Sequence, residues 1–125
     1  MKTLGKTCLI AGGVLAALLI VLSSLSGVKI EIVNLGPVVM KDVSVDVTGA
    51  SYSVGDIPAG TSKWVKVEPR GESSVSIKYS DSKGRQHTLF IDAYIEGGYS
   101  GKITAQVKNG KIIHMKQNIK LTPTI

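Results

Sequence analysis

The side chains of this sequence that could do acid–base chemistry or hold a metal are two histidines and nine acidic residues. His87 and His114 fall on different expected strands, and neither has a second histidine, cysteine or acid at metal-ligand spacing. Asp81-Ser82-Lys83-Gly84 opens like a calcium loop but lacks the later acids and the closing glutamate. We therefore expect strand or surface histidines, a hairpin loop at residues 81–84, and no metal.

Nucleophilic catalysis needs a base and an acid within reach of a nucleophile. His87, Asp92 and one of the many serines would supply the residue types, but no serine lies in a Gly-x-Ser-x-Gly elbow. Paired carboxylates depend on spacing in the fold, and the acids fall mainly on expected solvent-facing strand positions and in turns. The sequence predicts no catalytic residue, no cofactor and no enzymatic activity. A deep pocket with two acids, or with His87 beside an acid, would instead favour a small hydrolase.

A binding surface is suggested by the uneven distribution of charge along the chain. The formal net charge is +6, yet residues 28–98 contain six lysines and two arginines against nine acids. Residues 99–125 hold no acid and five lysines, which are Lys102, Lys108, Lys111, Lys116 and Lys120. Such lysines could meet lipid headgroups, an anionic polymer or an acidic partner, or they could protect exposed strand edges from pairing. If they bind a partner, charge reversal at Lys102, Lys108 and Lys116 should weaken that association.

Aromatic residues near the glycine-rich turn Gly97-Gly98 form a second candidate surface. Tyr94 and Tyr99 flank this turn and together could make a flat, adaptable contact. The alternative is that the glycines only make a tight turn and the tyrosines cap the edge of the core. Trp64, the sole tryptophan, is expected in the core, with a membrane-interface position as the alternative.

The N-terminal segment, residues 1–27, is expected to be a membrane anchor. No charged residue lies between Lys6 and Lys29, a gap of 22 positions that spans about 33 Å as a helix, enough for a bilayer core of about 30 Å. Lys2 and Lys6 place the N-terminus in the cytoplasm by the positive-inside rule. The alternative is a cleaved signal peptide, for which Ser24-Leu25-Ser26 offers small residues before the cut.

Residues 28–125 are expected to form one all-β domain, because short Val/Ile-rich alternating segments are separated by turn-forming residues. Cys8 is the sole cysteine and precedes this domain, so no disulfide framework is possible. The strand spacing favours a seven- to eight-stranded antiparallel β-sandwich of immunoglobulin-like architecture, with a small barrel as the alternative. The strands are expected at residues 28–32, 43–47, 52–54, 62–68, 75–79, 89–95 and 103–107, with the last one continuing through a hairpin.

The register of that last hairpin can be predicted from burial. Asn109-Gly110 would suit a two-residue turn that pairs Lys108 with Lys111, but a regular ladder from this turn would spoil the apolar face. We therefore expect a three-residue loop over residues 108–110, with Gly110 as the bulge residue, that pairs Ala105 with Ile113 and Ile103 with Met115.

Together these features predict a non-enzymatic protein of the cell envelope whose exported β-sandwich acts as a binding or assembly module. The domain would face the periplasm or the extracellular side, anchored by its own membrane helix, or be secreted after signal cleavage. An envelope protein or an anionic polymer is the expected partner, and an inhibitor of a lytic enzyme or a small extracytoplasmic hydrolase is the alternative function. The lysines are not interleaved with aromatic residues, so no nucleic-acid partner is expected.

Overall fold

The computed structural model describes residues 26–121, and within them it is all-β. The eight strands are β1 (Gly27–Asn34), β2 (Met40–Val47), β3 (Ala50–Ile57), β4 (Ser62–Val67), β5 (Ser73–Ser80), β6 (Gln86–Ile95), β7 (Tyr99–Lys108) and β8 (Lys111–Leu121). Each of the expected strands is confirmed. The expected anchor or signal segment lies almost wholly outside the described residues, and the described part contains no helix that is long and apolar enough to span a membrane.

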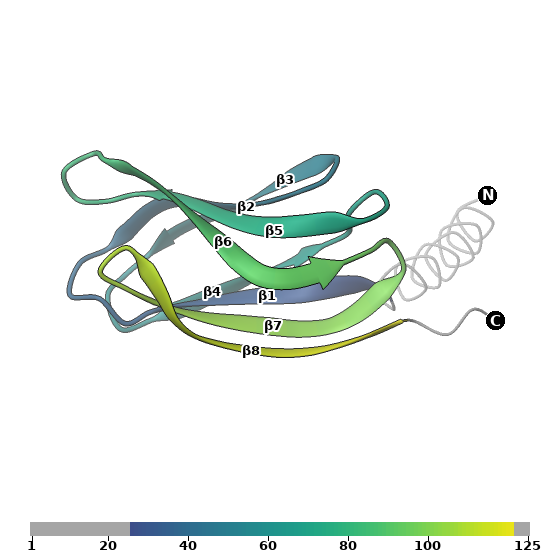
Figure 1. The fold of residues 1–125 in the computed structure, drawn as a ribbon. Helices are drawn as coiled ribbons and strands as arrows, with labels where there is room; N and C mark the ends of the chain where they lie inside the picture. Colours follow the sequence, from purple (N-terminus) through teal and green to yellow (C-terminus); the bar gives the residue numbers. More distant parts are fainter. Residues whose placement is uncertain (1–25, 122–125) are drawn as a thin grey trace, which may run out of the picture.

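The strands form two four-stranded sheets that pack face to face (Figure 1). One sheet, here called sheet A, has the order β4-β1-β7-β8, and the other, sheet B, has the order β3-β2-β5-β6. All neighbouring pairs are antiparallel except β1 and β7, which run parallel. The two sheets approach each other along both sides, where β3 lies near β4 and β6 lies near β8. The predicted β-sandwich is therefore confirmed at the level of two packed sheets.

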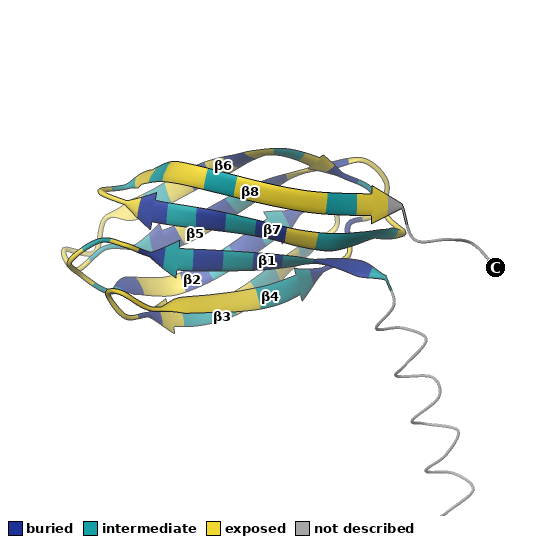
Figure 2. Cartoon of the chain, turned by 90° about the horizontal axis from the view of Figure 1, so that it is seen from below, coloured by how far each residue is buried: buried dark blue, intermediate teal, exposed yellow. Residues whose placement is uncertain are grey.

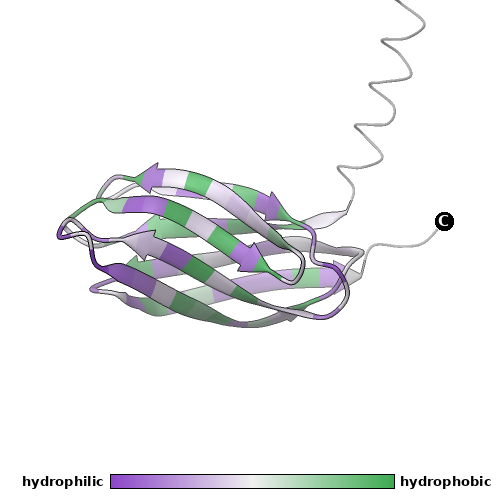
Figure 3. Cartoon of the chain, turned by 90° about the horizontal axis from the view of Figure 1, so that it is seen from above, coloured by the Kyte–Doolittle hydropathy of each residue, from purple (hydrophilic) through white to green (hydrophobic). Residues whose placement is uncertain are grey.

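Strict alternation explains the core between the sheets, because every second side chain of a strand points to the same face. Figure 2 shows this as alternating buried and intermediate bands along most of β1 and β7. The same alternation separates hydrophobic from hydrophilic positions on the strands of sheet B (Figure 3). The largest fully buried side chains are Ile30, Ile32, Ile57, Ile77, Ile95, Ile103, Val28, Val43, Val45, Val67 and Val75.

The side chain of Asn34, at the end of β1, is the main polar group inside this apolar surrounding and is only 2% exposed. Its amide nitrogen donates to the carbonyl oxygens of Val38 at 2.8 Å and Ile57 at 2.9 Å. Its amide oxygen accepts the backbone N–H of Gly36 at 3.0 Å. One side chain therefore ties the β1–β2 loop to the end of β3, at the end of the sandwich farthest from Gly27.

The predicted register of the last hairpin is wrong. Lys108 pairs with Lys111 around Asn109-Gly110, and both turn residues have positive φ, 53° and 73°, as a type I′ turn requires. The register then shifts between Val107, which pairs with Ile112, and Gln106, which pairs with His114. Ile113 is the extra residue, so a β-bulge inside β8 restores the apolar alternation that we had assigned to a longer loop.

Trp64 is also corrected, because its side chain is 55% exposed on the outer face of sheet A. Its neighbours on β4, Val65 and Val67, point into the core instead. The Nζ atom of Lys29 lies 4.2 Å from the Trp64 ring centroid, within the range of a cation–π contact. A strand alternates, so burying the two valines forces the tryptophan outward.

Candidate binding surface

The predicted lysines of the last two strands lie together on one face. Lys102 and Lys108 occupy outward positions of β7, between the buried residues of that strand. Thr104 of β7 pairs with Lys116 of β8, and Lys108 pairs with Lys111, so these lysines share the outer face of sheet A. Lys120 extends the set along β8.

Two further lysines join them that the sequence analysis did not identify. Lys29 of β1 pairs with Lys102 on one side and with Lys66 of β4 on the other, so three lysines stand in a row across three strands. They were missed because residues 28–98 have a nearly balanced charge and because the β1–β7 contact joins the two ends of the domain. Alternation was a usable signal. Lys29 adjoins Ile30 and Lys66 adjoins Val65 in the sequence, and because Ile30 and Val65 point inward, both lysines point outward.

We call this surface the basic face. It consists of Lys29, Lys66, Lys102, Lys108, Lys111, Lys116 and Lys120.

One acid, Glu31, is present in the four strands of sheet A. Its Oε1 atom lies 3.4 Å from the Nζ atom of Lys102, and the Thr104 hydroxyl donates to the same oxygen at 3.4 Å. Because the side chains of this ion pair are partly exposed, it contributes little to stability. A single carboxylate among seven lysines leaves the face strongly positive, and a face of one sign attracts and steers anionic partners.

The outer face of sheet B has a different character. Its outward strand positions are rich in serine, namely Ser44, Ser51, Ser53, Ser74, Ser76 and Ser80. Of the two lysines in its strands, Lys41 and Lys78, the second is paired with Asp46, with Nζ 3.0 Å from Oδ2. Hydrogen bonds from Ser51 and from Lys78 lower the pKa of the Asp46 carboxyl. The two faces therefore differ in charge, and the excess positive charge belongs to sheet A.

The tyrosines of the second candidate surface lie beside β8. Tyr94 and Tyr99 line a shallow hollow together with Gln117, Asn118 and Ile119. Tyr94 is 53% exposed, whereas Tyr99 is half-buried and packs against the core. A hydrogen bond with Glu72 raises the pKa of Tyr94 to about 12, so this phenol stays protonated over the physiological range.

The turn between these tyrosines is tight, as expected. The backbone N–H of Tyr99 donates to the carbonyl oxygen of Glu96 at 3.2 Å, and Gly98 has a φ of 89°.

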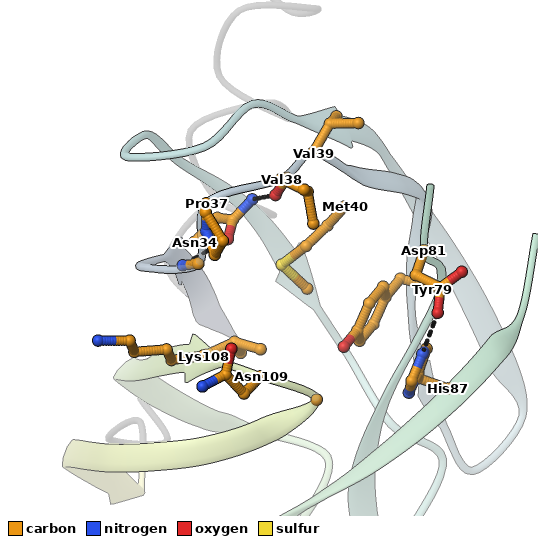
Figure 4. Close-up of a pocket in the computed structure, with 13 residues that line it drawn as sticks. Asn34, Pro37, Val38, Val39, Met40, Tyr79, Asp81, His87, Lys108 and Asn109 are labelled. Carbon is orange, nitrogen blue, oxygen red and sulfur yellow. Dashed lines mark hydrogen bonds and ion pairs between the residues drawn. The ribbon is translucent and has the colours of Figure 1, made fainter. Parts of the chain in front are cut away.

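A small pocket lies at the opposite end of the sandwich, among the β1–β2 loop, the β5–β6 hairpin and the β7–β8 turn (Figure 4). Its volume is about 200 Å³. The Nε2 atom of His87 lies 2.9 Å from Oδ2 of Asp81, and the ring of His87 stacks on Tyr79 with centroids 4.8 Å apart. The pairing of His87 with Asp81 was not predicted. A usable signal was the expected hairpin itself, because His87 pairs with Tyr79 and Asp81 begins the loop of the same hairpin.

Asp81 also organises its own loop. Its Oδ1 atom accepts the backbone N–H groups of Lys83 and Arg85, both at 2.9 Å. The hydrogen bond with His87, and then that from Arg85, lower the pKa of Asp81 to about 2. The predicted hairpin at residues 81–84 is confirmed. No cluster of three potential metal-ligating side chains occurs within residues 26–121.

The fold and this surface define an eight-stranded β-sandwich with one basic face. No family model matches the sequence, and no curated protein is significantly similar to it. Among solved structures, the fold is similar to the NMR structure of a protein from Eubacterium rectale, with a TM-score of 0.49 and 12% sequence identity. The alignment covers 76% of this chain and 87% of that chain.

Proposed function

We propose that this protein is a non-enzymatic binding or assembly module of the cell envelope, anchored in the membrane by residues 1–27, whose basic face contacts an anionic partner. In this proposal the sandwich is immunoglobulin-like in its general architecture and lies outside the cytoplasm. An anionic polymer or an acidic envelope protein would provide the matching charge.

The position of the lysines on inner strands carries the proposal. Edge strands commonly carry lysine to prevent pairing with other chains, and this accounts for lysines on β8. It does not account for Lys29 and Lys102, because β1 lies between β4 and β7, and β7 lies between β1 and β8. Lysines in the middle of a sheet give it a charged surface without protecting an edge, which supports a role in binding.

The geometry of the described ends is compatible with the proposed anchor. Gly27 at the start of β1 and Lys120 near the end of β8 both pair with Ser100 of β7, from opposite sides. The start of β1 at Gly27 and the last described residues of β8 therefore lie at the same end of the sandwich (Figure 2). A membrane anchor preceding Gly27 would hold this end at the membrane and project the pocket end away from it.

The proposal is tested with poly-L-glutamate as the anionic probe and the full chain in neutral detergent micelles. Combined Lys102→Gln, Lys108→Gln and Lys116→Gln substitutions should weaken binding by about a hundredfold, from about 1 kcal/mol per lysine near an anionic surface. The matched control combines Lys41→Gln, Lys78→Gln and Lys83→Gln, which removes the same charge from sheet B and its loop.

The control variant should bind within about twofold of the unmodified chain. Equal losses in the two triple variants would show attraction by net charge alone and would remove the basic face from the proposal. Unchanged binding in the first variant would do the same.

A second candidate function, a small extracytoplasmic hydrolase, is supported by the pairing of His87 with Asp81 beside a pocket. A carboxylate can orient an imidazole so that it accepts a proton from water. His87→Ala would abolish a hydrolytic activity while leaving polyglutamate binding unchanged, whereas the triple lysine variant would do the reverse.

A further inference from the structure

The outer edge of β8 is a long and regular unpaired strand edge. β8 is the last strand of sheet A, so its backbone groups on one side have no partner strand within residues 26–121. After the bulge at Ile113, residues 114–120 run in unbroken register with β7. Figure 2 shows that most of β8 is exposed along its length. Such an edge can accept another extended segment through backbone hydrogen bonds.

The other edge strands are less suitable. β4 has six residues, against eleven in β8. The pairing of β3 with β2 and that of β6 with β5 both contain register shifts. Irregular or short edges are common ways to prevent strand addition, and β8 lacks both features beyond residue 113.

The two sides of β8 have different chemistry. On the outer side are the basic residues Lys116 and Lys120, with Asn118 between them. On the inner side lies an apolar row of Met115 and Ile119, both partly buried against the core, which the exposed Gln117 interrupts. Because side chains alternate along a strand, a segment paired with β8 would place every second residue beside the lysines and the others beside the apolar row.

Exposed apolar side chains extend the inner side toward β6. Phe90, which is 74% exposed, and Ile113, which is 53% exposed, line a hollow between β6 and β8 with Ile112 and Met115. Asp92 lies in the same hollow and would repel an acid placed on this side. Further along, the hollow lined by Tyr94 and Tyr99 continues the same seam.

The lysines of β8 determine which kind of segment can pair with this edge. Two copies paired through β8 would bring their lysine rows side by side, and like charges opposite each other destabilise a strand pair. An acidic residue in the same position would instead be stabilised by Lys116 and Lys120. The edge is therefore protected against its own copies and open to an acidic strand.

We propose that β8 binds an extended protein segment in which acidic and apolar residues alternate, and that this segment adds to sheet A as a further strand. This inference rests on the proposed binding function and specifies its partner. The acidic residues would face the basic face, and the apolar residues would cover Phe90, Ile113, Met115 and Ile119.

The probe is a synthetic peptide of alternating glutamate and valine that is long enough to span residues 114–120. The control peptide has the same composition, with the glutamates grouped at one end, and a third peptide is N-methylated at alternate backbone nitrogens. With the full chain in neutral micelles, the alternating peptide should bind at least tenfold more tightly than the grouped one. It should also slow the exchange of backbone amide protons in β8, and the peptide methylated on the pairing side should lose both effects.

Two variants locate the site. Lys116→Gln should weaken the alternating peptide about fivefold, as expected for the loss of one cross-strand charge pair. Lys41→Gln removes the same charge from β2 of sheet B, outside the basic face, and should change the affinity less than twofold.

The results separate this inference from the proposed function. Equal binding of the alternating and grouped peptides, with both lost in the triple lysine variant, would retain the basic face and overturn strand addition. Binding of polyglutamate without binding of the alternating peptide would also retain the basic face and overturn strand addition. If the alternating peptide protects β3, β4 or β6 rather than β8, the assigned edge is wrong.

Discussion

Replacing Asn34 with alanine should destabilise the domain more than almost any other single polar substitution. The side chain makes three hydrogen bonds and is 2% exposed, at the junction of β1, the β1–β2 loop and the end of β3. Alanine would leave the carbonyl of Ile57 buried without this donor and the carbonyl of Val38 only partly accessible to water.

The expected magnitude follows from those two carbonyls. A buried polar group left without a partner costs about 1–3 kcal/mol. Because the bond to Val38 is part-buried, water can recover some of that cost, and we expect a total loss of about 2–4 kcal/mol in the free energy of unfolding. A domain of this size has roughly 5–15 kcal/mol of stability, so the variant should still fold.

Urea unfolding of the full chain in neutral micelles measures this loss as a lower midpoint with an unchanged slope. Asn118→Ala is the control, since Asn118 is exposed on β8 and its substitution should cost less than about 0.5 kcal/mol. Equal midpoints for the two variants would refute the role assigned to Asn34.

Three further predictions concern other parts of the sandwich. Gly101→Ala should open the β7–β8 ladder, because its Cβ would lie 2.0 Å from the carbonyl oxygen of Asn118. The control Gly60→Ala has open space around it and should cost only about 1–2 kcal/mol in stability. Backbone amide exchange in β8 should be faster in the first variant and unchanged in the second. The pKa of Asp81 is lowered from 3.8 to about 2, so its carboxylate stabilises the fold above about pH 4, and this contribution should be lost as the pH falls toward 2. The urea midpoint of the unmodified chain should therefore fall more steeply between pH 4 and pH 2 than that of Asp81→Asn. Parallel plots of urea midpoint against pH for the two chains would contradict this role of Asp81. Acrylamide should quench Trp64 fluorescence strongly, and a protected tryptophan would contradict its outward position.

Strand positions could be predicted from the sequence because alternation is a local property. The positions of Val43, Val45 and Val47, for example, determine both the strand and its buried face. The turns at residues 81–84 and 97–98 were predictable for the same reason. Glycine acts through its own backbone freedom, and aspartate acts through hydrogen bonds from nearby backbone N–H groups to its side chain.

Contacts that depend on distant pairing could be predicted only in part. The lysines of β7 and β8 were found by composition, but Lys29 and Lys66 join them through the parallel β1–β7 pair and the β1–β4 pair, which no local pattern specifies. The prediction placed the extra residue in the turn, whereas it is Ile113 within β8. A longer turn and a bulge in the strand can both restore the apolar alternation, so the sequence pattern does not distinguish them. The Asp81–His87 pair depends on how the β5–β6 loop closes, which residue spacing alone does not determine.

The most direct test of the basic face is a residue-by-residue NMR map of the full chain in neutral micelles as poly-L-glutamate is added. Backbone amide shifts should change along β1, β7 and β8 and stay constant on the serine-rich strands β2, β3 and β5. Shifts concentrated on sheet B, or no shifts at low salt, would contradict the assignment of the binding surface to sheet A.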